Sequence, residues 1–473
     1  MREYATRVAG VVSAGLDRAG VITPDRLSAT MGLAWPRIVT GFAIMSKQTV
    51  DLAFVGWAVG SRAVAGLAFA YAFWYLAKFL GVGLVGGTVS LVSQNYGGDE
   101  PGRAAVVVKQ SVWVAVALTT PVIACYVLFA GDLVGLLSSD AVSTRAGSTY
   151  LALVAPALLF EFLNLVSSRT YAGIGDTVTP MVVRAGGATV NVAVSAALVF
   201  GGGLGVAGVA IGTLVSTALA LAVFSWGMSG RSYGIPGMAA SPVGLSVRGP
   251  QFDAGIAGQL LRISAPIMAR RVLEGIVVFP LLWIASSFGP VVVAAFEIGR
   301  RVRAVITSVS WGFSIASSTL VGQALGAGDE RVATAYGAAI IRLSLVVYLA
   351  VAAVVLAVPD RIAGLFVADP AELAQAAVFV QVAAVSAVAF GIDGSATGAL
   401  RGAGDTRWPF LASVLGRYAF ALPAAALGLV GPLGVAGLYL AFVLEVAVPG
   451  LVNLWRFRTG RWRAVSRAYR PSA

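Results

Sequence analysis

Long apolar segments separated by short polar turns run through most of the chain. Each segment has about 20 residues or more, enough for a helix to cross a hydrocarbon core of roughly 30 Å. The pattern therefore predicts an all-α integral membrane protein with twelve transmembrane helices. We place these helices at about residues 32–58, 62–92, 104–130, 147–170, 180–202, 205–229, 259–287, 290–320, 335–358, 374–399, 409–430 and 434–456.

The second half of the chain repeats the first at a constant spacing of 229 residues. Four landmarks recur at this spacing: Gly60 as Gly289, Gln94 as Gln323, the Gly-x-Gly-Asp-Thr phrase of residues 173–177 at 402–406, and the Gly-Val-Ala-Gly phrase of residues 205–208 at 434–437. The shared spacing indicates a gene duplication. We therefore expect two pseudo-symmetric lobes of six helices each, an N-lobe at 32–230 and a C-lobe at 259–457. Internal repeats in a membrane protein are typical of transporters.

Arginine is concentrated in the loops that follow the even-numbered segments. These loops are predicted to hold Arg103, Arg169, Arg184, Arg231, Arg248, Arg331, Arg401 and Arg407. The loops after odd-numbered segments hold little beyond Arg62, Arg145 and Arg361. The positive-inside rule places the first group in the cytoplasm. Both termini are then cytoplasmic, and the two repeats share one orientation across the membrane.

Three segments lie outside the predicted lobes. Residues 1–31 mix charged and apolar positions without a clean cleavage site, which favours an interfacial helix over a signal peptide. Residues 231–258 are rich in Gly, Pro and Ser and predict a cytoplasmic linker. Residues 458–473 predict a basic cytoplasmic tail near anionic lipid. The arginines at this end of the chain are Arg456, Arg458, Arg461, Arg463, Arg467 and Arg470.

The composition supports a membrane protein and argues against several other classes. Hydrophobic residues make up 58% of the chain and charged residues 11%. The chain has no His and one Cys, so neither a disulfide framework nor a Cys-based metal cluster is expected. No catalytic constellation or phosphate-binding loop is present in the sequence, so we expect no enzyme, no cofactor and no use of ATP. The net charge of +12 fits basic cytoplasmic loops better than nucleic-acid binding.

Several short phrases resemble the multidrug and toxic compound extrusion (MATE) family. They are Leu33-Ala34-Trp35-Pro36, Ser264-Ala265-Pro266, Leu320-Val321-Gly322-Gln323 and the phrase Ala-Leu-Arg-Gly-Ala-Gly-Asp-Thr at 399–406. The resemblance covers about residues 32–457. It implies a V-shaped, two-lobed MATE-like fold of twelve helices. It also implies export of drugs and other amphipathic, often cationic organic compounds in exchange for H⁺ or Na⁺.

Three acidic residues fall inside predicted spans, namely Asp51, Glu274 and Asp393. A charged side chain at the bilayer centre costs roughly 2.5–3.5 kcal/mol on insertion scales, so such residues are functional candidates. All three positions resemble those where the family carries its coupling acids. A buried carboxylate can bind a proton, and Glu274 with Asp393 could instead form a Na⁺ site.

The repeat spacing assigns different chemistry to the two lobes. Asp393 corresponds to Asn164 in the first half, whereas Asp51 and Glu274 correspond to residues that are not acidic. We therefore expect the N-lobe site to centre on Asp51 and Asn164, with Asn191 as a further polar contact. The C-lobe site is expected to centre on Glu274 and Asp393.

Basic residues near two of these acids also allow a structural interpretation. Lys47 precedes Asp51 by four residues, so the two could form a buried ion pair on one helical face. Glu274 follows Arg270 by four residues and Arg271 by three. These arginines could neutralise Glu274 or could extend to the cytoplasmic surface instead.

Two other acids have neighbours that suggest a role. Glu297 has Arg300 and Arg301 at helical spacing and is interpreted as part of a structural ion pair. Glu161 lies three residues before Asn164 and could join its site or face a polar crevice.

Aromatic and loop residues also have alternative interpretations. Tyr71 and Trp74 could line a cavity and stack on a flat or cationic substrate, or they could belong to an interfacial aromatic belt. The repeated Gly-Asp-Thr phrases are interpreted as turns in which Asp176 and Asp405 cap the chain.

The expected function is secondary active export by a monomer in the cytoplasmic membrane, driven by H⁺ or Na⁺. The alternative is a lipid-linked oligosaccharide flippase of the same superfamily, which would need a strongly cationic cavity for pyrophosphate. Lys47, Lys78, Arg300, Arg301 and Arg303 keep this alternative open.

Asp393 is the strongest single candidate for ion coupling, because no basic residue lies within four positions of it on its own helix. We expect the variant Asp393→Asn to abolish efflux while the fold stays intact. Transport by reconstituted protein, compared with its unfolding temperature, tests this prediction. Full efflux by the variant would remove Asp393 from the coupling mechanism.

Overall fold

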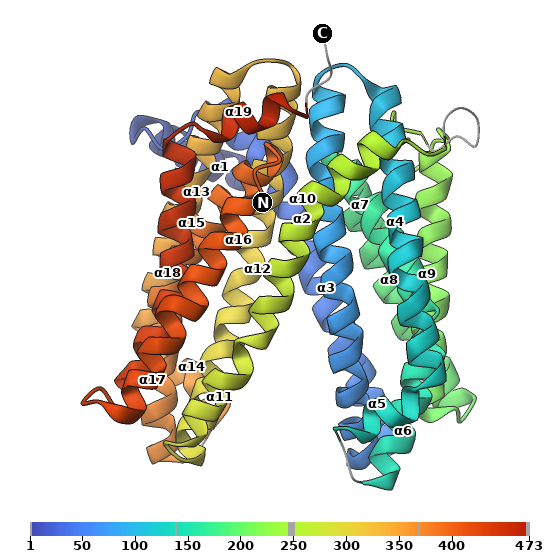
Figure 1. Cartoon of the computed structure of the whole chain (residues 1–473), viewed down its shortest axis with the longest axis vertical. Coiled ribbons are helices and arrows are strands. Elements are labelled where there is room, and N and C mark those ends of the chain that lie inside the picture. The colour runs from blue at the N-terminus through green and yellow to red at the C-terminus, as the bar shows by residue number, and fades with distance from the viewer. Residues whose placement is uncertain (1, 138–139, 245–250, 368, 470–473) are drawn as a thin grey trace. The chain divides into compact units, whose positions relative to one another are not determined.

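The computed structural model describes residues 2–137, 140–244, 251–367 and 369–469. The regular elements of these residues are all helices, as the sequence predicts (Figure 1). The first half contains α1 (Arg2–Arg18), α2 (Pro24–Ala58), α3 (Ser61–Gly97), α4 (Pro101–Leu128), α5 (Ala130–Gly135), α6 (Ala141–Val154), α7 (Ala157–Gly173), α8 (Val178–Ala196), η1 (Ala197–Gly201) and α9 (Gly205–Met228). The second half contains α10 (Ala254–Ile276), α11 (Val278–Ser286), α12 (Pro290–Gly326), α13 (Glu330–Ala357), α14 (Pro359–Ala363), α15 (Pro370–Gly402), α16 (Arg407–Val414), η2 (Leu415–Ala421), α17 (Leu422–Val430), α18 (Ala436–Arg458) and α19 (Trp462–Arg467).

Ten of the described helices are long and apolar enough to cross a membrane, and the bent pair α6 and α7 would make eleven. The predicted seventh span corresponds to α10 and α11. Four charged residues, Arg262, Arg270, Arg271 and Glu274, interrupt the apolar sequence of α10. The chain is therefore a multi-span membrane protein, while the count of twelve spans stays a prediction.

The predicted fourth span is broken rather than continuous. Its two parts, α6 and α7, meet at an angle of 52°. Pro156 lies at the break and offers no backbone N–H to continue the helical hydrogen bonds, although both Ala155 and Pro156 keep right-handed helical backbone angles. The break sets the direction of α7, which carries Glu161 and Asn164.

The described helices form two compact units, and their limits differ from those of the predicted lobes. The N-terminal unit contains Val39–Tyr96 and Glu100–Met268, and the C-terminal unit contains Met1–Ile38, Gly97–Asp99 and Ala269–Ala473. The start of α2 belongs to the C-terminal unit because Leu33 and Ala34 pack with Phe313 and other apolar residues of α12 and α13.

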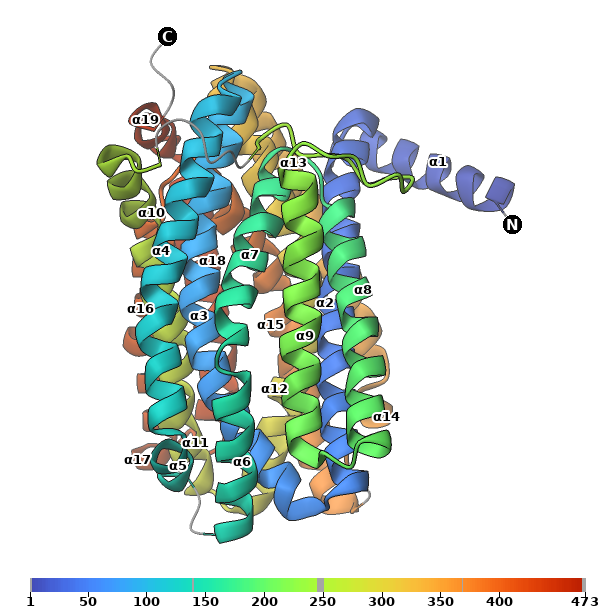
Figure 2. The ribbon, with the colours of Figure 1, turned by 90° about the vertical axis from the view of Figure 1, so that its right-hand side faces the viewer.

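In each unit, one helix packs against several neighbours. In the N-terminal unit, α9 packs against α6, α7 and α8 (Figure 2). In the C-terminal unit, α15 packs against α12, α13 and α18 (Figure 1). Through these contacts, α9 and α15 each bring side chains of several helices close together.

The segments outside the predicted lobes are partly helical. The N-terminal segment contains α1, while its position at a membrane interface stays a prediction. Residues 245–250 of the linker, with Arg248, and residues 470–473 of the tail, with Arg470, lie outside the described residues. Including Arg456 among the basic residues near lipid was wrong. It is buried at the end of α18, where its Nε donates to Asp405 Oδ2 at 2.8 Å.

The two repeated Gly-Asp-Thr turns use their aspartates differently. Asp176 caps the start of α8 as predicted, accepting from the backbone N–H of Thr179 at 2.9 Å. At the equivalent turn, Trp408 replaces this Thr. Asp405 instead accepts from Arg456, whose guanidinium lies 5.1 Å from the centre of the Trp408 ring. The repeats therefore share the turn but hold it in place by different contacts.

The tight packing of α12 on α15 depends on small residues at every fourth position. Gly394, Gly398 and Gly402 on α15 face Ser310, Ser314 and Ser318 on α12. A Cβ atom at Gly398 would lie 2.5 Å from the carbonyl oxygen of Ser314, and one at Gly402 would lie 2.5 Å from that of Ser318. Small residues at this spacing let two membrane helices approach closely. Because backbone atoms form the opposing surface, a side chain cannot be accommodated by a rotamer change.

We expect Gly398→Ala to destabilise the protein by about 1–3 kcal/mol, the usual cost of overpacking. Gly186→Ala is the matched control, because a Cβ atom there meets nothing within 4 Å. The control should be neutral or slightly stabilising, since Ala favours a helix over Gly by about 1 kcal/mol. Chemical unfolding of both variants in detergent tests the prediction, and equal stabilities would contradict it.

Candidate functional site

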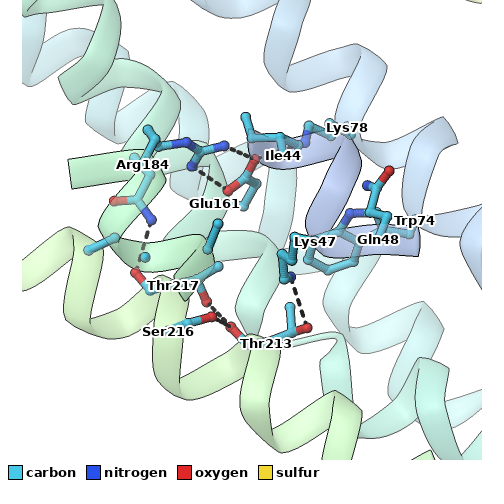
Figure 3. A pocket seen from close by; sticks show the side chains of 14 residues that line it. Ile44, Lys47, Gln48, Trp74, Lys78, Glu161, Arg184, Thr213, Ser216 and Thr217 are labelled. Carbon is cyan, nitrogen blue, oxygen red and sulfur yellow. Dashed lines mark hydrogen bonds and ion pairs between the residues drawn. The ribbon is translucent and has the colours of Figure 1, made fainter. Parts of the chain in front are cut away.

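A small polar cavity lies within the N-terminal unit (Figure 3). Five helices contribute its lining at helical spacings, so one face of each helix points inward. The volume available to water-sized molecules is about 60 Å³. The lining residues are Ile44, Lys47 and Gln48 of α2, Trp74 and Lys78 of α3, Glu161 and Asn164 of α7, Arg184, Gly187 and Ala188 of α8, and Thr213, Ser216, Thr217 and Ala220 of α9.

Glu161 is the centre of one ion-pair group in this cavity. Arg184 donates to both of its carboxylate oxygens, from Nη1 at 2.7 Å and from Nη2 at 2.8 Å, and Lys78 Nζ lies 3.0 Å from Oε1. A bidentate guanidinium–carboxylate pair has a fixed geometry and is among the strong ion pairs. Glu161 therefore joins the site that contains Asn164, one of the two alternatives from the sequence. The assignment of Arg184 to a cytoplasmic loop was wrong, because it lies in α8.

Asp51 lies beside this cavity and is bonded quite differently. Its side chain is 1% exposed, and neither carboxylate oxygen accepts a hydrogen bond from a described residue. Lys47 Nζ is 3.8 Å away, too far for a hydrogen bond, and donates instead to Thr213 Oγ1 at 3.1 Å. Asp51 and Lys47 are therefore a buried charge pair without a direct hydrogen bond.

The other N-lobe candidates surround this pair. Asn191 Nδ2 donates to Thr213 Oγ1 at 3.2 Å, so Thr213 links Asn191 to Lys47. Tyr71 is buried and packs edge-to-face on Tyr150, with ring centres 5.4 Å apart. Trp74 is also buried and lines the cavity. Since both aromatic residues are buried, neither forms part of an exposed belt in this structure.

Asn164 holds α7 and α9 together. Its Nδ2 donates to the backbone carbonyl of Thr217 at 2.9 Å, and its buried Oδ1 has no hydrogen-bond partner among the described residues. The structure therefore brings Asn164 together with Lys47 and Trp74 around the cavity. Asp51 lies next to Lys47, and Asn191 is linked to Lys47 through Thr213.

The C-terminal unit contains a second buried charge cluster, centred on Arg270. Its Nε donates to Glu274 at 2.8 Å, its Nη1 to Thr397 at 3.1 Å and its Nη2 to Asp393 at 2.7 Å. Asn453 Nδ2 adds a further hydrogen bond to Asp393 at 2.7 Å. Glu274 and Asp393 thus lie in one site, as predicted, but a guanidinium group bridges them.

The cluster continues as a chain of alternating charges. Arg271 Nη1 donates to Glu274 at 2.8 Å, and Arg417 Nη2 lies 3.4 Å from the same carboxylate. Arg417 is also 3.3 Å from Glu445, which pairs with Arg303 at 2.9 Å. Arg417 reaches these partners from the π-helical segment η2, an irregularity often found at functional sites. Each of the three acids in this cluster, Glu274, Asp393 and Glu445, therefore has at least one guanidinium partner.

Several sequence interpretations can now be compared with these contacts. Glu297 pairs with Arg300 at 2.8 Å, which confirms the structural ion pair. Arg270 and Arg271 both neutralise Glu274, which decides between the two alternatives for them. Asp393 does have a basic partner, but it comes from α10, so inspection of its own helix missed it.

Other functional candidates were missed. Glu445 and Arg417 lie inside predicted spans, and the search for intramembrane charge that found Asp51 could have found them. Arg401 was assigned to a loop, but it lies in α15 and its Nη2 donates to the Ser314 carbonyl at 3.0 Å. Asn453 gives no comparable signal, because a single Asn in an apolar helix does not reveal its partner.

No group of three or more His, Cys, Asp or Glu side chains suitable for a metal ion occurs within the described ranges. Carboxylate oxygens at Glu274 and Asp393 are of the type that binds Na⁺. In this structure, however, the cation between them is Arg270. The Na⁺ site at this pair stays a prediction, and it requires Arg270 to move.

The fold and the two clusters together define a class of protein. The chain is a helical, multi-span membrane protein with charged side chains buried in both units. Residues 36–197 and residues 266–427 each match the model of the MatE family. The two stretches are of equal length and together cover more than half of the chain, so the chain belongs to this transporter family. The double match agrees with the internal duplication.

Similarity to individual proteins and to a solved structure supports the same family assignment. The chain is 26% identical to "Probable multidrug resistance protein NorM" of Rhodopseudomonas palustris, over 93% of this chain and 94% of that protein. It is 28% identical to the protein of the same name from Deinococcus radiodurans, over 93% and 98% of the two chains. A structure of a multidrug resistance MATE family transporter in an outward-facing conformation has a TM-score of 0.83 at 19% identity, covering 93% of this chain and 96% of that one. The last comparison shows the same fold.

We expect Arg270→Gln to destabilise the protein by about 3–5 kcal/mol, because it leaves Asp393 and Glu274 buried with fewer partners. Arg300→Gln is the matched control, since Arg300 and Glu297 form an ion pair with side chains 29% and 38% exposed. Such a pair contributes about 1 kcal/mol or less.

Chemical unfolding of the two variants in the same detergent measures this difference. Similar losses would contradict a structural role for Arg270. The same pairing means that Asp393→Asn should cost stability as well as efflux, so the fold is not expected to stay fully intact.

Proposed function

We propose that this chain is a multidrug exporter of the cytoplasmic membrane, with both termini in the cytoplasm. It exchanges amphipathic or cationic organic compounds for an inward-moving cation, which we take to be a proton. The proposal is supported by the membership of the chain in the MatE family and by its similarity to relatives named "Probable multidrug resistance protein NorM". It acts as a monomer on this view.

Asp51 carries the proton in this proposal, because its bonding differs from that of the other two acids. Glu274 and Asp393 each accept hydrogen bonds from a guanidinium group. Protonating either one would leave a buried arginine without its full complement of negative charge, which is costly. Asp51 accepts no hydrogen bond from a described residue, so a proton there displaces no donor. This single observation carries the assignment.

A proton on Asp51 also changes the charge environment of Lys47, 3.8 Å away. With Asp51 neutral, the ammonium group loses its partner and keeps its hydrogen bond to Thr213. Since Thr213 also accepts from Asn191, a shift of Lys47 changes contacts among α2, α8 and α9. Exchange follows if the proton and the organic compound each favour the arrangement that the other disfavours.

The cavity beside Asp51 belongs to the ion side of this exchange. A buried water occupies about 10–15 Å³ of the volume available to water-sized molecules. The cavity, with about 60 Å³ of this volume, therefore holds roughly four waters. Drug-sized ligands occupy pockets of about 300–1,000 Å³. The organic compound therefore binds elsewhere.

Two of the three arginines that kept the flippase alternative open, Arg300 and Arg303, have acidic partners. Arg300 pairs with Glu297, and Arg303 pairs with Glu445. Their charges are therefore balanced locally and do not form a free cationic surface for pyrophosphate. Lys47 and Lys78 line a cavity with room for a few waters only.

Transport by sealed vesicles tests the proposal. The purified chain is reconstituted with a fluorescent organic cation inside, and a pH gradient or a Na⁺ gradient is imposed separately. We expect the pH gradient to drive substrate movement. We expect Asp51→Asn to lower that movement by at least about tenfold, because the variant side chain cannot bind the proton.

Two controls sharpen this experiment. Asp51→Glu keeps the carboxylate and should retain part of the activity, and Glu297→Gln removes an acid from the half-exposed pair and should leave activity unchanged. Movement driven only by the Na⁺ gradient would reject the proton and return attention to Glu274 and Asp393. No movement with either gradient would contradict the exporter proposal.

A further inference from the structure

The cavity of the N-terminal unit carries more positive than negative charge. Three cations, Lys47, Lys78 and Arg184, line it together with one carboxylate, Glu161 (Figure 3). Asp51 lies 3.8 Å from Lys47 and supplies a second negative charge. All four other groups act electrostatically on Lys47, so the five form one cluster. With each group ionised, the cluster carries one unit of net positive charge.

The cluster around Arg270 also has one more cation than acids, so the contacts within the cavity cluster, and not its net charge alone, distinguish it. Structural charges buried in a membrane protein are balanced by opposite charges or strong hydrogen bonds. Glu161 alone already satisfies Arg184, whose Nη1 and Nη2 both donate to it. Lys78 then adds a second cation to the same carboxylate, at 3.0 Å. Arg184 alone is therefore sufficient to neutralise Glu161, and the positive charge of Lys78 is in excess.

The hydrogen-bond donors of the two lysines exceed the acceptors assigned to them. An ammonium group has three N–H donors and no acceptor. Lys47 uses one donor on Thr213, and Lys78 directs one toward Glu161. The hydroxyl groups of Ser216 and Thr217 also line this space, but they already donate to the backbone carbonyl of Thr213, at 3.1 Å and 2.7 Å, so the surplus donors are those of the two lysines. A cavity with surplus donors and surplus positive charge is suited to a negatively charged ligand.

The size of the cavity limits that ligand. The space of about 60 Å³ corresponds to roughly four water molecules. A halide ion with a few waters, or one carboxylate group, has this size. A pyrophosphate attached to a lipid, or a whole drug molecule, does not.

We propose that this cavity is a binding site for one small monovalent anion, a halide or a carboxylate, held by Lys47 and Lys78. The anion neutralises the excess charge of the cluster. Its affinity is coupled to Asp51, because that carboxylate repels the anion and attracts Lys47. Removing the charge of Asp51 therefore strengthens anion binding. The site shares Asp51 with the proposed exchange, but its test is separate, because binding is measured at equilibrium without any gradient.

Anion titrations of the purified full chain in detergent test the proposal. Sodium gluconate serves as the background salt, and chloride or formate replaces it at constant ionic strength. Isothermal titration calorimetry gives the affinity, and the unfolding temperature provides a second readout, because a ligand of the folded state stabilises it. Saturable binding of chloride points to a free halide, and binding of formate alone points to an acid group of a larger compound. Either result supports the site.

Variants with opposite expected effects separate this site from general salt effects. Lys78→Gln should weaken anion binding by at least about tenfold, because it removes a charge-assisted hydrogen bond while Arg184 still satisfies Glu161. Asp51→Asn should strengthen binding by at least about fivefold, since it removes a negative charge near the anion. Arg145→Gln, a charge removal at an exposed position of the same unit, should leave binding unchanged.

Two results would overturn the proposal. One is the lack of a saturable response to both chloride and formate in the unmodified chain. The other is equal affinity in the unmodified chain, Lys78→Gln and Asp51→Asn. If Lys78→Gln does not fold, the increase expected for Asp51→Asn still decides, because loss of structure cannot produce tighter binding. Failure of the anion site leaves the vesicle experiment unaffected, and the reverse also holds.

Discussion

Compensation of buried charge is the constraint on which the rest of this structure depends. An ionised side chain inside a membrane protein is stable only when opposite charges or strong hydrogen bonds replace its water. The chain meets this constraint twice, in two ways. Around Arg270, acids and guanidinium groups alternate with direct hydrogen bonds, as between Arg270 and Asp393. Around Lys47, the contact with Asp51 is longer, at 3.8 Å, and includes no direct hydrogen bond. The first arrangement is suited to holding helices together, and the second can change its protonation state at a lower cost.

The helix packing makes these clusters possible. Charged side chains from α10, α15 and η2 can meet only if the helices that carry them approach closely. The contact between Gly398 and the backbone at Ser314 brings α15 against α12 without large side chains between them. In the N-terminal unit, the break at Pro156 directs α7 so that Glu161 meets Arg184 of α8. The same local sequence features that shape the fold therefore determine which charges become partners.

The sequence predicted the fold class, the duplication and the family, because these depend on apolar length and on repeated phrases that survive in one chain. It also identified the intramembrane acids, because charge inside an apolar segment is conspicuous. It could not identify partners on other helices. Asp393 and Arg270 are 123 residues apart, and no local spacing connects them. Arg184 and Arg401 were placed in loops because the ends of apolar segments are poorly defined. Their burial became visible only with the packing of their helices.

The two halves of this duplicated chain now use different bases. The chain's three lysines all lie in the first half, and two of them line the cavity, whereas the cluster around Arg270 contains arginine as its only base. Arginine keeps its proton under practically all conditions, while a buried lysine can give it up. One half of the protein can therefore change the charge of its bases and the other cannot. The two halves descend from one repeat, but the charge of the basic side chains can now change in the first half and is fixed in the second.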